Sequence, residues 1–422
     1  MKKLVSILLV LVMALSFTGC GKKDKTPTTA QTVHIWHTYT EGQKETLESI
    51  VAAFNKEYEG KITVVCEDQE YKGFTNKVYE AVAAGTGPDI IMNYASTAAS
   101  YVGASDEETL VVNLKDYLEQ DYSKLVNAGV YEECNAFTDG QMHVLPMVTT
   151  GPVFFYNKTL FEQAGITEAP TTWEEVGEDA KIIHEKLGIV GFAADSLTDL
   201  YQSIIMQSGL SYIDTDTKTV KFLTDELATW LKWFQAGVEE GYFELGPQSG
   251  DYLSNDINAG LCASYVGSSA GIPYLTLPNN NELACVSLPQ VKDAKTQWAP
   301  AWDRGVIVFK SNADQEWAAV KFAEYFVNEE NNTAWCKSMN AFSPYLATQK
   351  NTEYTDFVST DIALTALSKQ ISYSGVLPTP AGSSTVRDEL EALVKKVATG
   401  TDVKTAMADC QKSCDAALQE AE

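Results

Sequence analysis

Short apolar segments alternate with helix-like segments along the first part of this chain, and that alternation restricts its fold more than any other feature. Residues 33–36, 61–67 and 89–92 are short runs typical of strands. Residues 47–58 and 74–84, which lie between them, carry apolar side chains at helical spacing. Strands joined by helices predict a parallel sheet covered by helices on both faces, which is an α/β fold.

The same pattern starts again after Pro146. Strands are expected at residues 153–156, 189–194, 261–266 and 302–310. The chain is mainly helical from Asp314 onward. Because 422 residues are too many for one compact core, two successive α/β units with a helical tail predict two lobes.

Local signals mark several helix ends in this second part. Gly165 and Gly188 suit left-handed C-terminal caps. Residues 172–175 have the spacing of a capping box, and Thr224 is an N-cap candidate. Residues 267–269, Gly-Ser-Ser, are a natural helix start after a strand.

The first 20 residues have the pattern of an exported lipoprotein. An apolar run at residues 4–15, after a basic start, is short for a membrane span and typical of a signal peptide at residues 1–19. Residues 16–20, SFTGC, resemble the lipobox of bacterial lipoproteins, which implies attachment of two acyl chains at Cys20. An ordinary secretory peptide with a chance cysteine is the alternative. Residues 20–32 form the lipidated start and a polar, flexible tether.

The formal charge of −26 excludes some partners. Removal of the signal peptide takes away two lysines and no acidic residue, which leaves −28. A polyanion repels nucleic acid, so no DNA or RNA partner is expected. The sequence has only two arginines, Arg304 and Arg387. Because arginine is a favoured clamp for phosphate and carboxylate groups, this scarcity favours a neutral ligand.

Seven cysteines follow Cys20, and their odd number and scattered positions argue against a disulfide framework. Cys410 and Cys414 are four residues apart and could face each other on one helix. The sequence has no Cys-x-x-Cys pair and only four histidines, so we expect no metal site and no cofactor. It also lacks the His-Glu-x-x-His motif of metalloproteases, and we expect no catalytic residues.

Several segments taken together resemble one protein family. They are Trp36-His37, AGTGPDII at 84–91, FYNK at 155–158, AG at 164–165, PTTWEE at 170–175, AGLCA at 259–263, Gly267-Ser268 and AAVKF at 318–322. In this order they resemble the family 1 extracellular solute-binding proteins of ABC importers, the group of the maltose-binding and sn-glycerol-3-phosphate-binding proteins. The resemblance covers the chain from Val33 to its C-terminus.

The resemblance implies an α/β, two-lobed periplasmic-binding-protein-like fold with a hinge that the chain crosses three times. We expect lobe I at residues 33–146 and 303–342, and lobe II at residues 147–302 and 343–422. The crossings are expected near residues 145–150, 290–302 and 340–346. The ligand is expected between the lobes, where loops converge beyond the carboxyl ends of strands.

Loops that follow the expected strands supply the candidate ligand contacts, because a sugar needs an aromatic face and polar groups for its hydroxyls. They are Trp36, His37, Thr38, Tyr39, Asn93, Thr149, Thr150, Asp195, Ser196, Gly267, Ser268, Trp302, Asp303 and Arg304. We place the centre at Trp302 and Asp303, a stacking ring beside a carboxylate, with Thr150 and Ser268 as polar contacts. Phe342 and Tyr345 near the third crossing are weaker candidates.

Some of these candidates have a structural alternative. Trp36 could belong to the core, and His37 could be a structural hydrogen-bonding group. Asp195 could cap the helix that follows it. Asp303 and Arg304 could pair with each other rather than with a ligand.

The resemblance implies a binding protein rather than an enzyme: a monomeric lipoprotein on the outer face of the bacterial cytoplasmic membrane, facing the periplasm in a Gram-negative cell. It would deliver a sugar or polyol to the permease of an ABC importer. In the glycerol-phosphate binder a serine matches Thr150, a glutamate matches Ala95, and tryptophans match Ser196 and Asp199, so these departures point to another ligand. The alternatives are a glycerol phosphate or other phosphorylated ligand, a peptide ligand, a secreted hydrolase and a surface interaction module.

Overall fold

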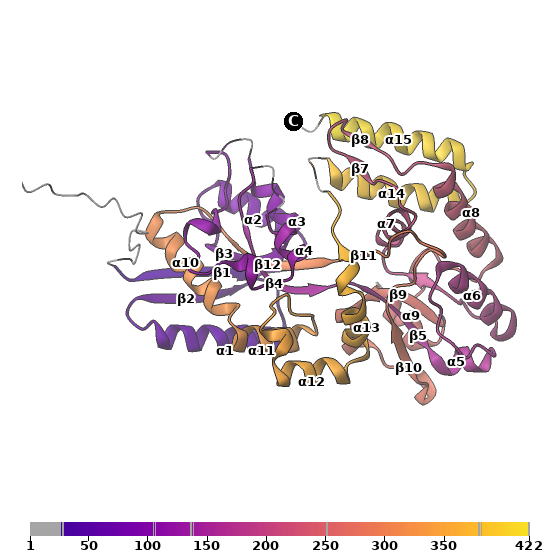
Figure 1. The fold of residues 1–422 in the computed structure, drawn as a ribbon, viewed down its shortest axis with the longest axis horizontal. Coiled ribbons are helices and arrows are strands. Elements are labelled where there is room, and N and C mark those ends of the chain that lie inside the picture. Colours follow the sequence, from indigo (N-terminus) through magenta and orange to yellow (C-terminus); the bar gives the residue numbers. More distant parts are fainter. Residues whose placement is uncertain are drawn as a thin grey trace, which may run out of the picture.

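Two separate sheets, each with its own helices, organise the chain in the computed structural model (Figure 1). The structure describes residues 27, 29–103, 105, 107–135, 137, 139–249, 252–378, 380 and 382–420. The signal peptide and the lipid attachment at Cys20 therefore lie outside the described residues, as does most of the tether before β1. No helix within the described ranges is both long and apolar enough to cross a membrane.

The sheet of lobe I has the strand order β2-β1-β3-β12-β4. Its strands are β1 (Gln31–His37), β2 (Ile62–Asp68), β3 (Ile90–Tyr94), β4 (Val144–Thr150) and β12 (Trp302–Val308). The first three are parallel, as expected, but β12 is antiparallel to both β3 and β4. The expectation of a fully parallel sheet is wrong here because β12 enters from lobe II, at the edge where the other strands end.

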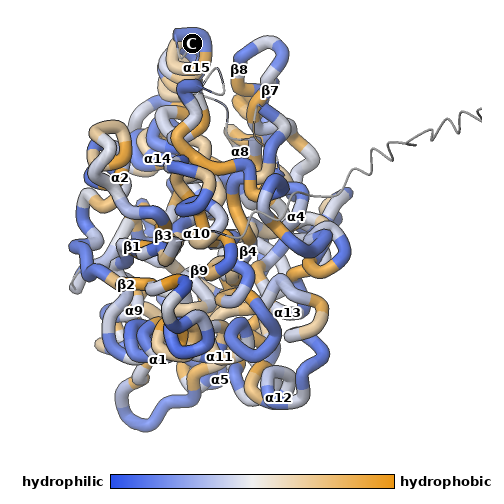
Figure 2. The backbone as a smooth tube through the Cα atoms, turned by 90° about the vertical axis from the view of Figure 1, so that its left-hand side faces the viewer, coloured by the Kyte–Doolittle hydropathy of each residue, from blue (hydrophilic) through white to orange (hydrophobic). Residues whose placement is uncertain are grey.

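Helices cover both faces of this sheet. On one face lie α1 (Glu41–Glu57), α10 (Ala313–Phe326) and α11 (Glu329–Met339), which bury one apolar stripe each against the strands. On the other face lie α2 (Phe74–Ala83), α3 (Ala95–Ala98) and α4 (Ala128–Glu133). Every residue of β4 is buried. Figure 2 colours the chain by the hydropathy of its residues: hydrophobic residues are common in the central segments, and several outer loops are hydrophilic.

The sheet of lobe II has the order β10-β5-β9-β6. Its strands are β5 (Pro152–Asn157), β6 (Ala193–Ala194), β9 (Ser264–Ser268) and β10 (Leu283–Val286). Only β6 and β9 are parallel; β5 is antiparallel to β9 and β10. The parallel-sheet expectation is thus wrong in lobe II as well, because β5 arrives from lobe I. The strand expected at 189–194 shrinks to two paired residues.

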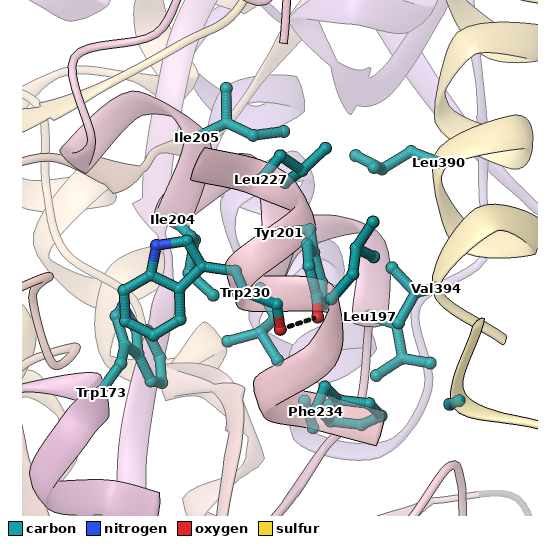
Figure 3. Packing of buried hydrophobic residues seen from close by; sticks show 14 of the residues in the cluster. Trp173, Leu197, Tyr201, Ile204, Ile205, Leu227, Trp230, Phe234, Leu390 and Val394 are labelled. Atoms are coloured by element: carbon teal, nitrogen blue, oxygen red, sulfur yellow. Dashed lines mark hydrogen bonds between the residues drawn. The ribbon is translucent and has the colours of Figure 1, made fainter. Parts of the chain in front are cut away.

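Most helices of lobe II pack around one large hydrophobic core (Figure 3), whereas α9 and α13 pack in a second, smaller cluster. Its helices are α5 (Lys158–Gln163), α6 (Trp173–Leu187), α7 (Leu197–Gln207), α8 (Asp225–Glu240), α9 (Leu253–Ala259), α13 (Ile362–Gln370), α14 (Ser383–Ala398) and α15 (Val403–Glu420). Tyr201 on α7 donates its hydroxyl to the carbonyl of Trp230 on α8 at 3.0 Å, inside this core. The helical tail from α14 thus completes lobe II.

Short elements connect these parts. They are α12 (Thr352–Thr360), the strand pairs β7 (Ile213–Asp214) with β8 (Thr219–Val220) and β11 (Ala299–Pro300) with β13 (Ser374–Gly375), and the 3-10 helices η1 (Ala99–Tyr101), η2 (Leu114–Asp116), η3 (Tyr122–Lys124), η4 (Ser269–Tyr274), η5 (Pro278–Asn280), η6 (Thr348–Lys350) and η7 (Ile371–Tyr373).

The helix-end signals of lobe II are largely confirmed. Thr172 and Glu175 form the predicted capping box at α6, and Gly188 ends that helix with φ 71°. Thr224 caps α8 by accepting from the amide of Leu227. The exception follows β9, where the expected helix start leads into a six-residue 3-10 helix, η4, that contains Pro273.

Three segments join the lobes. Gly151 connects β4 to β5, Ala301 connects β11 to β12, and the chain after α11 pairs Phe342 with Thr149. A Cβ on Gly151 would lie 3.0 Å from the carbonyl oxygen of Pro300, so the first two crossings touch. The core of lobe I includes Tyr345 and Tyr354, both past the bound expected at residue 342, and the lobe bounds stay predictions.

Candidate functional site

The candidate residues gather where the two sheets adjoin. In lobe I, β1, β3 and β4 end at the edge where β12 begins, because β12 is antiparallel to its neighbours. In lobe II, β6 and β9 end at the edge where β5 begins. The amide of Ser269 donates to the carbonyl of Gly151 at 2.9 Å, which ties the two edges together. The polar loops predicted from separate strands are therefore neighbours in space.

The end of β1 is well packed. Trp36 is half-buried and donates its indole N–H to Glu67 at 3.1 Å, while Lys77 lies over its ring. His37 is only 2% exposed, its Nδ1 accepts from the amide of Tyr39, and burial lowers its pKa. These contacts hold the side chains of Trp36 and His37 in place at the end of β1, whereas Thr38, between His37 and the buried Tyr39, is half-buried.

Arg304 stacks on Tyr94 beside the end of β3. Its guanidinium carbon lies 4.3 Å from the centroid of the Tyr94 ring, and Nη2 donates to the Tyr94 hydroxyl. Both side chains are half-buried. Asn93, on the preceding position, uses its Oδ1 to accept from the Tyr94 amide at 2.8 Å. This arrangement presents a positive group beside an aromatic ring.

Asp303 points away from Arg304, since successive side chains of a strand alternate between the two faces of the sheet. It is 3% exposed and accepts a hydrogen bond from the Thr149 hydroxyl at 2.5 Å. Glu133 on α4 lies against it, and burial, followed by the negative charge of Asp303, raises the pKa of Glu133 well above its ordinary value. The expected alternative, a pair between Asp303 and Arg304, is wrong.

Trp302 begins β12 at the edge that adjoins lobe II. Its carbonyl accepts from the Thr150 hydroxyl at 3.4 Å, and the residue is only half-buried. Within the described ranges no other ring stacks on its indole. The structure therefore leaves part of this aromatic surface accessible, but it does not bring Trp302 and Asp303 to the same face.

In lobe II, Asp195 and Ser196 follow β6. Ser196 caps α7 by accepting from the amide of Asp199 at 3.1 Å. Asp195 instead accepts from the amide of Leu253 at 3.1 Å, the first residue of α9. The alternative that Asp195 caps its own following helix is therefore wrong. Burial raises its pKa to about 6.

Gly267 and Ser268 end β9 beside this carboxylate. A Cβ on Gly267 would lie 2.4 Å from Cε2 of Tyr265 and 2.6 Å from Oδ2 of Asp195, so a larger residue would displace one or both side chains. Ser268 is half-buried and its hydroxyl accepts from the amide of Ala270 at 3.3 Å. Phe342 and Tyr345, the weaker candidates, are both buried in the cores.

Three residues at these edges were missed by sequence reasoning. Tyr71, three residues after β2, is 76% exposed, and Tyr252, directly before α9, is 65% exposed. Both are large aromatic surfaces near the candidate loops. Tyr71 and Tyr252 could have been found from the sequence, because they lie beside the ends of a strand and a helix. Glu133 could not, because it lies on α4, a short helix that does not follow an expected strand.

Residues 267–271, GSSAG, also fit the Gly-x-Ser-x-Gly pattern of serine hydrolases. Ser269 is fully buried, and its hydroxyl has no hydrogen-bond partner in the described part of the chain. A serine nucleophile needs an adjacent base, which this one lacks. The pattern therefore gives no support to a hydrolase.

Other features of the described surface lie away from these edges. A hollow of about 380 Å³ is lined by Thr219, Val220, Lys221, Leu223, Gln411 and Asp415. A second one, of about 280 Å³, is lined by residues around Tyr122. None of the candidate ligand residues lines either one. Among the described residues no group of three or more His, Cys, Asp or Glu side chains is arranged to hold a metal ion.

The cysteines of the described chain are all free. The sulfur atoms of Cys410 and Cys414 lie 3.8 Å apart on α15, which confirms that they face each other on one helix.

Comparison with known proteins places the chain in a family. Residues 39–333 match the family described as bacterial extracellular solute-binding protein. The chain is 24% identical over 386 residues to the maltodextrin-binding protein MdxE of Bacillus subtilis, covering 84% of this chain and 83% of that protein. It is also 24% identical over 346 residues to the sn-glycerol-3-phosphate-binding periplasmic protein UgpB of Agrobacterium fabrum, covering 78% and 77%.

Solved structures share the whole fold. The cyclic alpha-maltosyl-1,6-maltose binding protein from Arthrobacter globiformis has a TM-score of 0.80 at 19% identity and covers 92% of this chain and 99% of that one. UgpB from Mycobacterium tuberculosis, solved with glycerophosphocholine, has a TM-score of 0.78 at 16% identity, with coverage of 92% and 98%. The two-lobed α/β fold is thereby confirmed, and the chain belongs to the bacterial extracellular solute-binding protein family.

Proposed function

We propose that this protein is the substrate-binding component of an ABC importer, which captures a sugar or polyol between its lobes and delivers it to the permease. One observation carries the proposal: within the fold of a solute-binding family, polar and aromatic residues from separate strands meet where the two sheets adjoin. Open α/β sheets bind ligands beyond the carboxyl ends of their strands, which is this edge in both lobes.

The chemistry of the edge suits a polyhydroxylated ligand. The half-exposed indole of Trp302 and the exposed rings of Tyr71 and Tyr252 offer flat apolar faces to sugar C–H groups. Thr150 and Ser268 place hydroxyls at adjoining ends of β4 and β9. Relatives named as binders of maltodextrin, diacetylchitobiose and arabinooligosaccharide support the same class of ligand.

The proposal includes the cell location. Anchoring through Cys20 would hold the protein as a monomer on the outer face of the cytoplasmic membrane, next to the permease. The free, mostly buried cysteines of the described chain fit a fold that needs no disulfides in that compartment.

A thermal-shift screen with purified protein tests the proposal. A ligand present at a hundred times its Kd stabilises a protein by about 2.7 kcal/mol, which raises the melting temperature measurably. We expect a saturable shift with at least one mono- or oligosaccharide or polyol, confirmed by calorimetry. Because two relatives are named for glycerol phosphate, that compound and short peptides belong in the screen. A shift with peptides and none with any sugar, polyol or phosphorylated polyol would contradict the proposal.

A further inference from the structure

Arg304 lies at the candidate site and has no carboxylate partner among the described residues. The guanidinium of Arg304 is stacked on Tyr94, yet its Nε is buried and has no hydrogen-bond partner among the described residues. Among the described residues, the groups that act on it electrostatically are the side chains of Tyr94, Tyr39 and Tyr71, and no aspartate or glutamate. Keeping a half-buried guanidinium, with its Nε fully buried, away from any carboxylate is costly. A ligand that brings the negative charge would remove this cost.

The second arginine of the chain shows the usual arrangement. Arg387 on α14 donates to Asp199 at 3.1 Å and to Gln202 at 2.9 Å. The sequence has 57 acidic residues for 31 basic ones, so a carboxylate partner is easy to supply. The contrast indicates that the unpaired state of Arg304 is a property of its position at the edge.

Tyr39 adds a second unused donor next to this arginine. Its hydroxyl is buried and has no hydrogen-bond partner in the described structure. Burial, partly opposed by the positive charge of nearby Arg304, raises the pKa of Tyr39 to about 12. The hydroxyl therefore stays protonated at neutral pH and can donate. The Arg304 Nε–H and the Tyr39 O–H thus lack acceptors in the described structure, and both belong to or lie near a positively charged guanidinium. The oxygens of an acidic group would supply both the acceptors and the negative charge.

We propose that the ligand carries an acidic group, a carboxylate or a phosphate, which binds the guanidinium of Arg304 and the hydroxyl of Tyr39. The inference rests on the proposed function, because it names the class of sugar or polyol at that same site. The Tyr94 ring holds the guanidinium in place before the ligand arrives, which lowers the ordering cost of binding. In a chain of charge −26, a local cation is also what lets an anion approach.

Matched pairs of compounds test this inference by calorimetry on the purified protein. The pairs are glucuronate with glucose, digalacturonate with the neutral galactose disaccharide, glucose phosphate with glucose, and glycerol phosphate with glycerol. We expect the acidic member of at least one pair to bind about tenfold or more tightly than its neutral partner. The pair that responds separates a carboxylate from a phosphate.

Variants of Arg304 and Tyr39 test whether these two residues bind the acidic group of the ligand. Arg304→Gln should lower the affinity for the acidic compound on the order of ten- to a hundredfold, and Arg304→Lys should restore part of it. Tyr39→Phe should lower it about tenfold without loss of stability, because the hydroxyl has no partner inside the described protein. Arg387→Gln, which removes the paired arginine, should leave the affinity unchanged. Tyr39→Phe keeps the test valid if Arg304→Gln does not fold.

Two other outcomes remain distinct. Equal affinity for acidic and neutral members, with Arg304→Gln lowering both alike, would overturn the acidic ligand and leave sugar binding standing. Absence of binding by every saccharide and polyol, acidic or neutral, would overturn the proposed function and this inference with it.

Discussion

Glu133 and Asp303 lie against each other in the interior of lobe I. The Glu133 Oε2 is buried with no donor facing it in the described structure, and burial raises the pKa of Asp303 as well as that of Glu133. Two adjacent buried carboxyl groups cannot both ionise cheaply, so the pair keeps one proton to a higher pH than an ordinary carboxyl group would. The folded protein keeps this proton to higher pH than the unfolded chain does. Its contribution to stability is therefore greatest in acid and is lost as pH rises.

We therefore expect Glu133→Gln to be more stable than the parent protein in alkaline solution. The amide keeps the shape of the protonated carboxyl and cannot ionise. Melting temperatures should differ by a few degrees near about pH 8 and converge near about pH 4. Glu132→Gln, which removes a carboxylate from the exposed neighbouring residue, should not show this pH-dependent difference from the parent protein. If the melting temperatures of the two variants depend on pH in the same way, the shared proton is disproved.

Trp302 and Asp303, adjacent in sequence, should respond oppositely to truncation. Asp303→Ala leaves the buried Thr149 hydroxyl without its acceptor, which should cost about 1–3 kcal/mol of stability. Trp302→Ala removes a half-exposed ring, so stability should change little while sugar affinity falls about tenfold. Denaturant unfolding and calorimetry separate these effects. An Asp303→Ala protein of normal stability but lost affinity would instead make Asp303 a ligand contact.

At the scale of single residues, the sequence predicted which residue types follow the strands, but not to which face of the sheet each side chain points. Residues 302–304 were expected to act together, yet strand geometry sends Asp303 to one face and Arg304 to the other. The partner of Asp303 could not be predicted, because Glu133 is distant in sequence and sits on a six-residue helix. The arginine count favoured a neutral ligand, but a count cannot show that one of two arginines is unpaired.

The junction of β6, β9 and α9 depends on one glycine. A Cβ on Gly267 would come 2.6 Å from the Asp195 Oδ2 and would also collide with the Tyr265 ring. Gly267→Ala should therefore displace the carboxylate that accepts from the first amide of α9. We expect a loss of about 1–3 kcal/mol in stability and weaker ligand binding.

Gly271→Ala is the matched control for that change. It lies four residues further along, in η4, and a Cβ there would meet nothing within 4 Å. Chemical denaturation and calorimetry on both variants make the comparison. If the two alanine variants behave alike, the close packing of Gly267 against Asp195 has no energetic importance.

Elements with strong local signals were predicted well. The capping box at Thr172 and the glycine end at Gly188 bound α6 as expected. β4 was missed because Pro146 was taken as a break. The structure tolerates this proline because β4 is an edge strand and its register with β12 shifts beside Gly305. The antiparallel orientation of β12 in the sheet of lobe I, and of β5 in the sheet of lobe II, could not be predicted from local sequence patterns either. Each orientation follows from how the chain passes between the lobes.

At the scale of the whole molecule, the proposed lipid anchor and the proposed ligand site would lie at opposite ends of lobe I. β1 runs from Gln31 to His37 and ends at the candidate site. The expected tether, residues 20–32, runs into the start of β1 and therefore joins this sheet at the end away from the candidate site. Ten residues separate Cys20 from Gln31, and such a segment can span at most about 35 Å. This distance would keep the protein close to a permease without the tether meeting the ligand.

The anchoring proposal predicts that Cys20→Ala changes location and not binding. Without the acylated cysteine the protein should leave the membrane fraction, either released after cleavage or retained as an uncleaved precursor. Sugar affinity of the released protein should equal that of the parent, because the tether joins β1 at the edge away from the candidate residues. Cell fractionation with immunoblotting measures the first effect and calorimetry the second. The control variant Thr18→Ser, which leaves the cysteine in place, should remain in the membrane. Normal processing with full membrane retention of Cys20→Ala would show that another segment anchors the chain.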